Sequence, residues 1–374
     1  MKKSRVYYWI GWFFLWCVGS SCSDGAGCSV VKEDSLTVER QEIALFKMVN
    51  RQGMTVKVTN YGASLVYLSA PDVRGVYEPV VLGLDSLSGY LGRQPKLGAT
   101  VGRYANRIAQ ATLVLDGDTV CLDNNAKGHC IHGGFQGFHT RIFQTDTCYV
   151  VKDTTVVVFS YVSRHGEGGF PGNLHVSVAY KLTQDNALVL DYTAVSDKST
   201  PVNFTNHSYF NLTGCKSSVA GHSCRIGGDS ITVVDSTGVP TGELMPVSGT
   251  DYDFRALQPL APRLAGRAKG YDVNYKLTKE PGSLAWAATV IDSVSGRVLK
   301  AYTTEPGMQF YVPAADFSYL KGQAGRVGRY SGLCLEMQHF PDSPHHPHFP
   351  TTLLHPGEQY RQTTVYKFET LNQY

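Results

Sequence analysis

The sequence has little excess charge of either sign and no cluster of basic residues. Its 374 residues carry a formal net charge of +3, and no block of lysine and arginine stands out. Proteins that hold nucleic acid by its phosphates need a concentrated positive surface. A nucleic-acid partner is therefore not expected.

Helical periodicity is nearly absent as well, and after residue 35 there is no linker and no internal repeat. Instead, turn residues separate short segments in which every second residue is apolar or aromatic, most clearly residues 175–182, 187–194 and 364–368. Alternation over four to eight residues between turns is typical of strands. The pattern predicts one large all-β domain of stacked, mostly antiparallel sheets.

The chain also lacks an apolar run of comfortable transmembrane length. A basic start precedes the apolar run from Val6 to Val18, which is followed by small residues and Cys22. This order is typical of a secretory signal. Residues 18–22 resemble a bacterial lipoprotein signal, in which Cys22 would become the lipidated N-terminus.

From this we expect three parts in the chain. Residues 1–22 are predicted to be a signal peptide, residues 23–34 a small and polar tether, and residues 35–374 the folded domain. The protein would be exported, either to the periplasm or as a lipoprotein anchored to the membrane through Cys22.

None of the nine cysteines has the spacing of a zinc site. Seven remain outside the signal segment, so within a monomer at least one is unpaired. Export would permit disulfides, and Cys121 with Cys130, or Cys215 with Cys224, would close short loops. Buried free thiols are an equal alternative, since cysteine is often a core residue.

Two segments in the first half place polar side chains where a strand pattern does not require them. In residues 102–108, Asn106 and Arg107 supply hydrogen-bond donors that suit sugar hydroxyls; the alternative is a surface turn with solvated arginines. In residues 130–134, His132 precedes two glycines whose backbone would let a ligand approach closely. A hydrogen-bonded turn histidine is the alternative.

The second half holds two more such segments. If residues 203–212 are extended, His207 and Tyr209 share one face; a half-buried histidine bonded to a neighbour is the alternative. In residues 332–338, Glu336 lies on a predicted strand, where glutamate usually faces solvent. Asp272 and Gln309 are smaller features of the same kind.

Taken in order, these segments resemble the aldose 1-epimerase (galactose mutarotase) family. The matching motifs are Gly-Arg-x-Ala-Asn-Arg-Ile, His-Gly-Gly, Asn-His-Ser-Tyr-Phe-Asn-Leu, Tyr-Asp, Pro-Gly-x-Gln-Phe-Tyr and Leu-Glu-x-Gln, and the resemblance runs from about Leu36 to Phe368. It implies a galactose mutarotase-like β supersandwich. It also implies an enzyme that interconverts the α and β anomers of free aldoses such as galactose or glucose.

The resemblance implies a role for each residue that matches a family motif. Glu336 would be the general base and His207 the general acid. His132 and Arg107 would assist at the ring oxygen and the hydroxyls, and the residues that hold the sugar would be Asn106, Tyr209, Asp272 and Gln309. A monosaccharide is the expected partner, and we expect the protein to be a monomer.

Two departures from the family pattern bear on the sugar. Asp272 is followed by Val273, where the family commonly has histidine, and Gly137-Phe138-His139 replaces the usual Gly-Phe-Asp. Neither changes a proposed proton-transfer residue, but both leave the preferred aldose open.

The chemistry itself needs an acid and a base at one pH. A proton leaves the C1 hydroxyl while another reaches the ring oxygen. A carboxylate and an imidazolium supply the two functions, and Glu336 and His207 are the pair that the sequence offers. Acid and base exchange roles when the ring closes again, so no cofactor or metal is required.

Three other functions compete with this hypothesis. A glycoside-cleaving enzyme would need paired carboxylates, for which Asp272 and Glu336 are candidates, but the histidines would then have no purpose. A non-catalytic sugar-binding protein could share the fold, and so could a relative acting on sugar phosphates, although no extra basic cluster supports that.

The histidines of residues 344–348 could bind metal, but the flanking prolines favour a loop.

Overall fold

The computed structural model describes residues 22–23, 27–322, 325–326 and 328–374. The predicted signal peptide, residues 1–22, lies outside these ranges apart from Cys22. Within them, no helix is long and apolar enough to cross a membrane.

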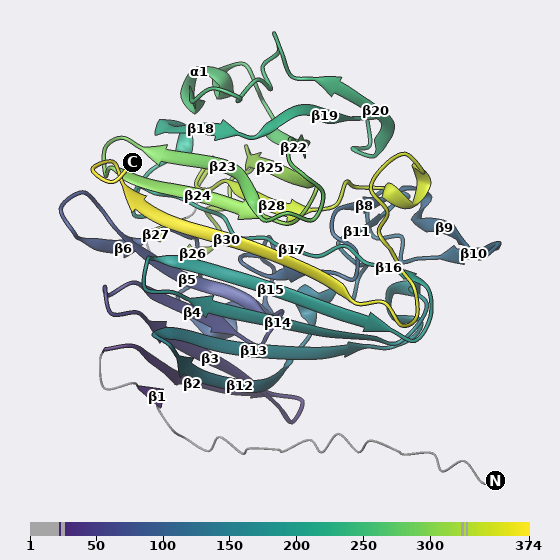
Figure 1. Ribbon diagram of the computed structural model, residues 1–374, viewed down its shortest axis with the longest axis horizontal. Helices are drawn as coiled ribbons and strands as arrows, with labels where there is room; N and C mark the ends of the chain where they lie inside the picture. Colours follow the sequence, from purple (N-terminus) through teal and green to yellow (C-terminus); the bar gives the residue numbers. More distant parts are fainter. Residues whose placement is uncertain (1–21, 24–26, 323–324, 327) are drawn as a thin grey trace, which may run out of the picture.

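The N-terminal part of the chain forms a six-stranded antiparallel sheet, drawn in purple and blue in Figure 1. Each strand pairs with its sequence neighbour, as expected for alternating segments separated by turns. In order across the sheet, the strands are β1 (Cys22–Ser23), β2 (Ser29–Val38), β3 (Gln41–Val49), β4 (Thr55–Thr59), β5 (Ser64–Pro71) and β6 (Tyr77–Pro79).

A nine-stranded antiparallel sheet crosses the front of the molecule in Figure 1. The last strand of the chain, β30, inserts in its middle between β15 and β24, so that the C-terminus joins two parts of the sheet. The order is β12 (Gln144–Val151), β13 (Thr154–Ser163), β14 (Leu174–Leu182), β15 (Ala187–Ser196), β30 (Tyr360–Thr370), β24 (Arg297–Thr303), β23 (Ala285–Asp292), β18 (His222–Ile226) and β21 (Gln258–Pro259).

The third large sheet has five antiparallel strands and carries much of the candidate site. Its order is β20 (Pro240–Pro246), β19 (Gly228–Val234), β22 (Gly270–Leu277), β25 (Gly307–Pro313) and β28 (Cys334–Gln338). Two-stranded pairs complete the fold: β10 (Asp118–Cys121) with β9 (Thr112–Leu115), β11 (Cys130–Ile131) with β8 (Arg107–Ile108), β16 (Thr200–Pro201) with β29 (Leu353–Leu354), β17 (Thr205–Asn206) with β7 (Thr100–Val101), and β26 (Lys321–Gly322) with β27 (Gly325–Arg326).

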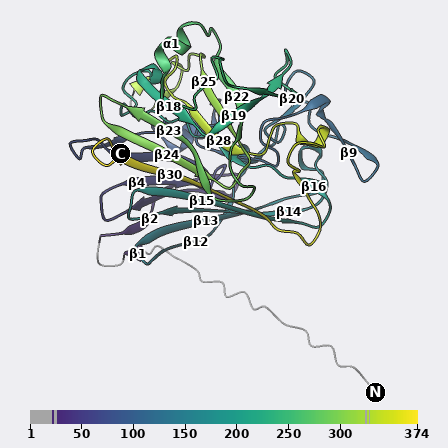
Figure 2. The same cartoon turned by 45° about the horizontal axis from the view of Figure 1, so that its top comes forward.

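Helices are short and lie between the strands. The α-helix α1 (Leu260–Ala265) lies at the opposite side of the molecule from β1 and β2 in both views (Figures 1 and 2). The other helices of the described residues are 3-10 helices: η1 (Leu87–Leu91), η2 (Ala109–Ala111), η3 (Phe138–Thr140), η4 (Glu167–Gly169), η5 (Val219–Gly221) and η6 (Ser343–His345).

One continuous hydrophobic core joins the three sheets. It includes Leu65 of the six-stranded sheet, Val178 and Leu190 of the nine-stranded sheet, and Phe310 and Met337 of the five-stranded sheet, all at most 1% exposed. In β14, every second residue is buried, as the alternation predicts. The all-β fold with stacked antiparallel sheets is therefore confirmed.

The predicted tether is partly wrong. Residues 29–34 belong to β2 and pair with β3, with Val30 opposite Met48. Val30 is fully buried in the core, so this part of the small polar segment is held by the sheet. The six-stranded sheet therefore includes residues before position 35, beginning with β1 (Cys22–Ser23).

The two loop-closing cysteine pairs are not disulfides in the structure. Cys121, Cys130, Cys215 and Cys224 are free thiols, and Cys130 and Cys224 are buried. Of the two alternatives left open by the sequence, the structure therefore has the free thiols.

Gly98 provides a test of the packing that supports the candidate site. Its φ is +65°, and a Cβ atom there would lie 1.7 Å from the carbonyl oxygen of Leu65. Its N–H donates to the carbonyl of His207 at 2.9 Å. Gly75 has a similar φ of +80° with nothing within 4 Å of a Cβ position, which makes it a matched control.

We expect Gly98→Ala to lower the free energy of unfolding by about 3 kcal/mol or more. Backbone strain of about 1–3 kcal/mol adds there to an overpacking cost of about 1–3 kcal/mol, whereas Gly75→Ala bears only the strain. Urea unfolding of both variants measures the difference. Equal losses in the two would contradict the close approach of Gly98 to Leu65.

Candidate active site

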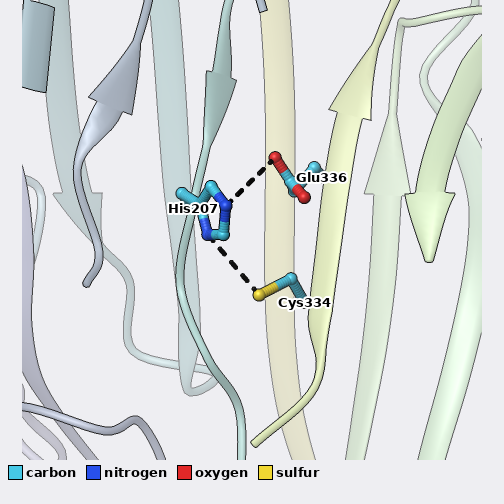
Figure 3. A group of neighbouring side chains, drawn as sticks. All are labelled: His207, Cys334 and Glu336. Carbon is cyan, nitrogen blue, oxygen red and sulfur yellow. Dashed lines mark hydrogen bonds and ion pairs between the residues drawn. The ribbon is translucent and has the colours of Figure 1, made fainter. Parts of the chain in front are cut away.

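Glu336 lies in β28, at the edge of the five-stranded sheet. Its strand neighbours Leu335 and Met337 pack into the hydrophobic core, so the alternation of the strand turns Glu336 to the other face. It is nevertheless only 2% exposed, because the segment that carries His207 lies across that face (Figure 3). The solvent-facing alternative considered for this glutamate is therefore excluded.

His207 follows β17 and is held by its backbone on both sides. Its N–H donates to the carbonyl of Ala99, and its own carbonyl accepts from Gly98, both at 2.9 Å. Both ring nitrogens face β28 (Figure 3): Nε2 lies 3.9 Å from Oε2 of Glu336, and Nδ1 lies 3.6 Å from Sγ of Cys334. The longer contact is beyond hydrogen-bond range, so each group stays available to a third molecule.

His132 joins this pair from a different part of the fold. Strand β11 pairs with β8, which brings His132 beside Asn106, and the rings of His132 and His207 lie 5.6 Å apart, edge to face. Nδ1 of His132 accepts from the N–H of Asn106 at 3.2 Å. A neutral His132 therefore carries its proton on Nε2 and can donate from there.

Asn106 and Arg107 lie at the same corner. The side-chain oxygen of Asn106 accepts from the N–H of Arg107 at 2.9 Å and from its guanidinium at 3.4 Å. Asn106 and His132 both have left-handed φ angles, 59° and 53°. Such strained residues persist where the surrounding structure fixes them and are frequent at functional sites.

Asp272 and Gln309 reach the site through the register of the five-stranded sheet. Gln309 lies opposite Glu336 in the pairing of β25 with β28, and Asp272 lies opposite Tyr311 in that of β22 with β25. The side-chain amide of Gln309 donates to Asp272 at 2.5 Å. Asp272 is exposed whereas Gln309 is buried. Together they connect the protein surface with the buried carboxyl group of Glu336.

A row of buried polar atoms in this sheet has no hydrogen-bond partner among the described residues. It comprises Oε2 of Glu336, Oε1 of Gln309, and both amide ends of Asn274 and Gln338. Asn274 lies opposite Gln309 in the register. Buried polar groups are almost always hydrogen-bonded, so the row is suited to a ligand with several hydroxyl groups.

Tyr209, predicted from the resemblance to hold the sugar, lies beside His207. Its ring stacks on that of His207 at 5.0 Å, and its hydroxyl donates to the carbonyl of Pro95 at 3.1 Å. It is only 2% exposed. These contacts fix the ring of Tyr209 against the imidazole of His207 and use the hydroxyl proton of Tyr209.

Burial drives both ionisable groups of the pair toward their neutral forms. Burial, reinforced by the charge of Asp272, raises the pKa of Glu336 to about 8, although Lys96 and Arg107 oppose the rise. Burial, reinforced by the charge of Lys96, lowers the pKa of His207 to about 3. The pKa of His132 is also well below its usual value, mainly because of burial.

Lys96 is a residue of this site that the sequence did not reveal. Its charge acts on Glu336, His132 and His207, and the side chain is partly buried. Burial lowers the pKa of Lys96, and the charge of Glu336 opposes that effect. A lysine in a polar loop normally faces solvent, so no sequence signal pointed to it. The contact of Cys334 with His207 likewise had no sequence signal, because Cys334 is one of several residues on a predicted strand.

One group of side chains in the described chain has ligand atoms close enough for a metal ion. His207, Cys334 and Glu336 place them within 4.8 Å of one another. Burial and the nearby carboxylates, however, raise the pKa of the Cys334 thiol well above its usual value, and a protonated thiol is a poor ligand. The donor set therefore suits proton transfer better than metal binding.

The histidine-rich loop is held by hydrogen bonds within the protein. His345 pairs with Asp342 at 2.6 Å, and the rings of His346 and His348 bond to the carbonyls of Pro240 and Gly242 at 3.1 and 2.8 Å. These contacts agree with the loop that the flanking prolines favoured.

Comparison with known proteins gives consistent matches over most of the chain. The family model described as aldose 1-epimerase matches residues 44–367. A galactose mutarotase from Rattus norvegicus is 42% identical over 318 residues, which cover 84% of this chain and 91% of the relative. An aldose 1-epimerase from Escherichia coli (strain K12) is 37% identical over 345 residues, covering 89% and 97%.

Solved structures agree with these sequence matches. An aldose epimerase homologue from C. elegans superposes with a TM-score of 0.80 at 30% identity, covering 88% of this chain and all of its own. A galactose 1-epimerase from Lactobacillus acidophilus NCFM has a TM-score of 0.79 at 27% identity, covering 92% and 98%.

The raised pKa of Glu336 predicts a stability effect that is independent of activity. A carboxyl group whose pKa is higher in the folded than in the unfolded chain stabilises the fold below pH 4.5, and this contribution is lost as the pH rises through about 8. Glu336→Gln keeps the shape without the charge. We expect it to be more stable than the wild type at pH 9 by a few kcal/mol, at about 1.36 kcal/mol per pKa unit.

Denaturant unfolding at pH 5 and pH 9 measures this effect, and the advantage of Glu336→Gln should shrink at pH 5. Glu243→Gln, at an exposed position, is the control and should change little at either pH. A constant difference between wild type and Glu336→Gln across this range would show that Glu336 has an ordinary pKa.

Proposed function

This chain belongs to the aldose 1-epimerase family, an isomerase family that interconverts sugar anomers, and from that premise we propose that Glu336 and His207 exchange the protons of the reaction. The relatives' names do not favour the glycoside-cleaving or the non-catalytic alternative. The observation that carries the proposal is the buried contact of 3.9 Å between Nε2 of His207 and Oε2 of Glu336, next to unpartnered polar atoms.

Ring opening moves one proton from the sugar to Glu336 and another from His207 to the sugar. The Glu336 carboxylate takes the proton of the C1 hydroxyl, the bond between C1 and the ring oxygen breaks, and Nε2–H of His207 protonates that oxygen. Rotation about the C1–C2 bond then presents the other face of the aldehyde. Closure runs the transfers in reverse, with His207 as base and Glu336 as acid, as microscopic reversibility requires.

The pair therefore alternates between two forms with the same net charge. With the cyclic sugar bound it is a carboxylate and an imidazolium, and with the open-chain sugar it is a carboxylic acid and a neutral imidazole. Burial favours the second form, as the pKa of Glu336 near 8 and that of His207 near 3 indicate. The protein thus favours the protonation state that accompanies the high-energy open-chain intermediate.

Six neighbouring residues support the ionised form of Glu336 or the bound sugar. The cations of Lys96 and Arg107 both lower the pKa of Glu336 and so favour its carboxylate. A neutral His132 offers Nε2–H to a sugar oxygen. Gln309 and Asp272 supply acceptors for hydroxyl groups, and Asn106 positions His132 and Arg107 through its hydrogen bonds.

The substrate that suits this site is a free aldose, of the galactose or glucose type. Its hydroxyl groups would satisfy the row formed by Glu336, Gln309, Asn274 and Gln338. A hydrogen bond from a buried group to a ligand hydroxyl gives strong discrimination, because an analogue without that hydroxyl leaves the group unpaired.

The first test is loss of mutarotation. We expect Glu336→Gln and His207→Asn each to reduce the enzymatic rate by about 10²–10⁴-fold, the usual contribution of one positioned proton-transfer group. Polarimetry of freshly dissolved α-galactose measures it. His175→Asn, at an exposed position of β14, is the matched control and should keep the wild-type rate. Near-wild-type rates in either site variant would refute the assignment.

We also propose that residues 1–22 direct export and that Cys22 carries a lipid. The support is the basic start, the apolar run from Val6 to Val18 and the small residues before Cys22. The first strand of the six-stranded sheet, β1, begins at Cys22 itself, so the domain would lie close to the membrane surface.

Expression of the full chain in a bacterial host tests the anchor. The wild type should fractionate with membranes, whereas Cys22→Ser should appear in the soluble fraction. Cys121→Ser, which removes an exposed thiol, should behave as the wild type. An unchanged distribution of Cys22→Ser would rule out the lipid anchor.

A further inference from the structure

A second candidate site is a cavity whose lining includes His339, the residue that follows β28. Its volume is about 890 Å³, and it opens between the loop Thr304–Pro306, the segment after β28, and one end of β30. None of its lining residues is one of the groups assigned to the reaction. Pockets that bind small molecules commonly measure about 300–1,000 Å³, so this cavity is large enough for a sugar ring.

A buried ion pair forms one wall of the cavity. Nδ1 of His339 lies 2.5 Å from Oε2 of Glu305, and Glu305 is only 2% exposed. Burial lowers the pKa of His339, but the Glu305 carboxylate outweighs that effect and the pKa is raised. Glu305 occupies Nδ1, and no hydrogen bond among the described residues uses Nε2, so Nε2–H is free to donate.

Neither the fold nor the reaction explains this ion pair. The backbone of His339 is already fixed by Asn203, whose side chain accepts from its N–H at 2.9 Å and donates to its carbonyl at 3.3 Å. Burying two charges costs desolvation free energy, and apolar residues of similar size are often as stable. Glu305 and His339 take no part in the proton transfers described above.

The other charges that line the cavity are positive. Lys276 and Arg361 are exposed, and no acidic partner within 4.0 Å is found for either in the described chain. The ammonium group of Lys279 donates to the carbonyls of Ser283 and Thr304 at 2.7 and 3.0 Å and adds its charge nearby. Glu305 is the one carboxylate among the lining residues of the described chain, and His339 neutralises it.

The remaining wall is apolar and suits the face of a sugar ring. The rings of Phe340 and Phe349 pack edge to face at 5.2 Å, and Pro306 and Pro350 lie beside them. An apolar wall with a few directed polar groups is the usual composition of a small-molecule site.

We propose that this cavity binds an anionic sugar, a pyranose that carries a carboxylate or a phosphate group. The anion lies between Nε2–H of His339 and the guanidinium of Arg361, and the ring packs against Phe340 and Phe349. Both anions accept charge-assisted hydrogen bonds from these two donors. This site is independent of the epimerase site and of its proposed residues.

Calorimetric titration of the purified protein in saturating galactose tests the proposal, because galactose occupies the epimerase site. The probes are galacturonate, galactose 6-phosphate and, as the arm without a sugar, inorganic phosphate. We expect one or both anionic sugars to bind under these conditions, and the comparison identifies the favoured anion. His339→Gln and Arg361→Gln should each weaken that binding about tenfold or more, since each removes a charge-assisted donor.

Arg164→Gln, at an exposed position outside the cavity, is the matched control and should bind as the wild type. Mutarotation should be unchanged in all three variants. Arg361→Gln keeps the test valid if His339→Gln does not fold, because Arg361 is exposed. The proposal is overturned if neither anionic sugar binds, if galactose displaces them, or if Arg361→Gln binds as tightly as the wild type.

Discussion

The burial of a carboxyl group and an imidazole side by side is the constraint on which the rest of the site depends. Glu336 and His207 are 2% and 5% exposed and only 3.9 Å apart. Removing two ionisable groups from water is costly, and it penalises their charged forms. In the proposed mechanism the pair passes from charged to neutral and back, and the same cost favours the neutral form. An arrangement that does little for stability thus suits the proposed reaction.

The fold holds this pair by backbone contacts and not by the pair's own attraction. His207 is fixed because its carbonyl accepts from the N–H of Gly98 and its N–H donates to the carbonyl of Ala99. Glu336 is fixed because Leu335 and Met337 are anchored in the core. Neither side chain has to make a strong bond to the other. Nε2 of His207 and Oε2 of Glu336 therefore remain available for the proposed proton transfers.

The residues around Glu336 and His207 exert opposing effects on the ionisation of Glu336. Lys96 and Arg107 favour the carboxylate form of Glu336, while Asp272 and burial oppose it. The unpartnered amides of Asn274 and Gln338 are a further cost that a bound polyhydroxyl ligand would remove. At the second cavity the balance is different, because Glu305 and His339 satisfy each other and leave a positive surface. The chain therefore has one buried site that favours neutral side chains and one cavity whose unpaired charges are positive.

The sequence by itself determined the fold class, the order of the motifs and the identity of the residues that meet. Alternation in segments such as residues 175–182 is local, so it survives folding and can be recognised without coordinates. Only the tertiary structure decided what depends on contacts between distant segments. It buried Glu336 under the His207 segment, brought Lys96 to the site and used the hydroxyl of Tyr209 for Pro95. It also paired residues 29–34 with β3, although their composition resembled a tether. These outcomes depend on which segments pack together, and the charge or polarity of a single residue does not reveal its neighbours.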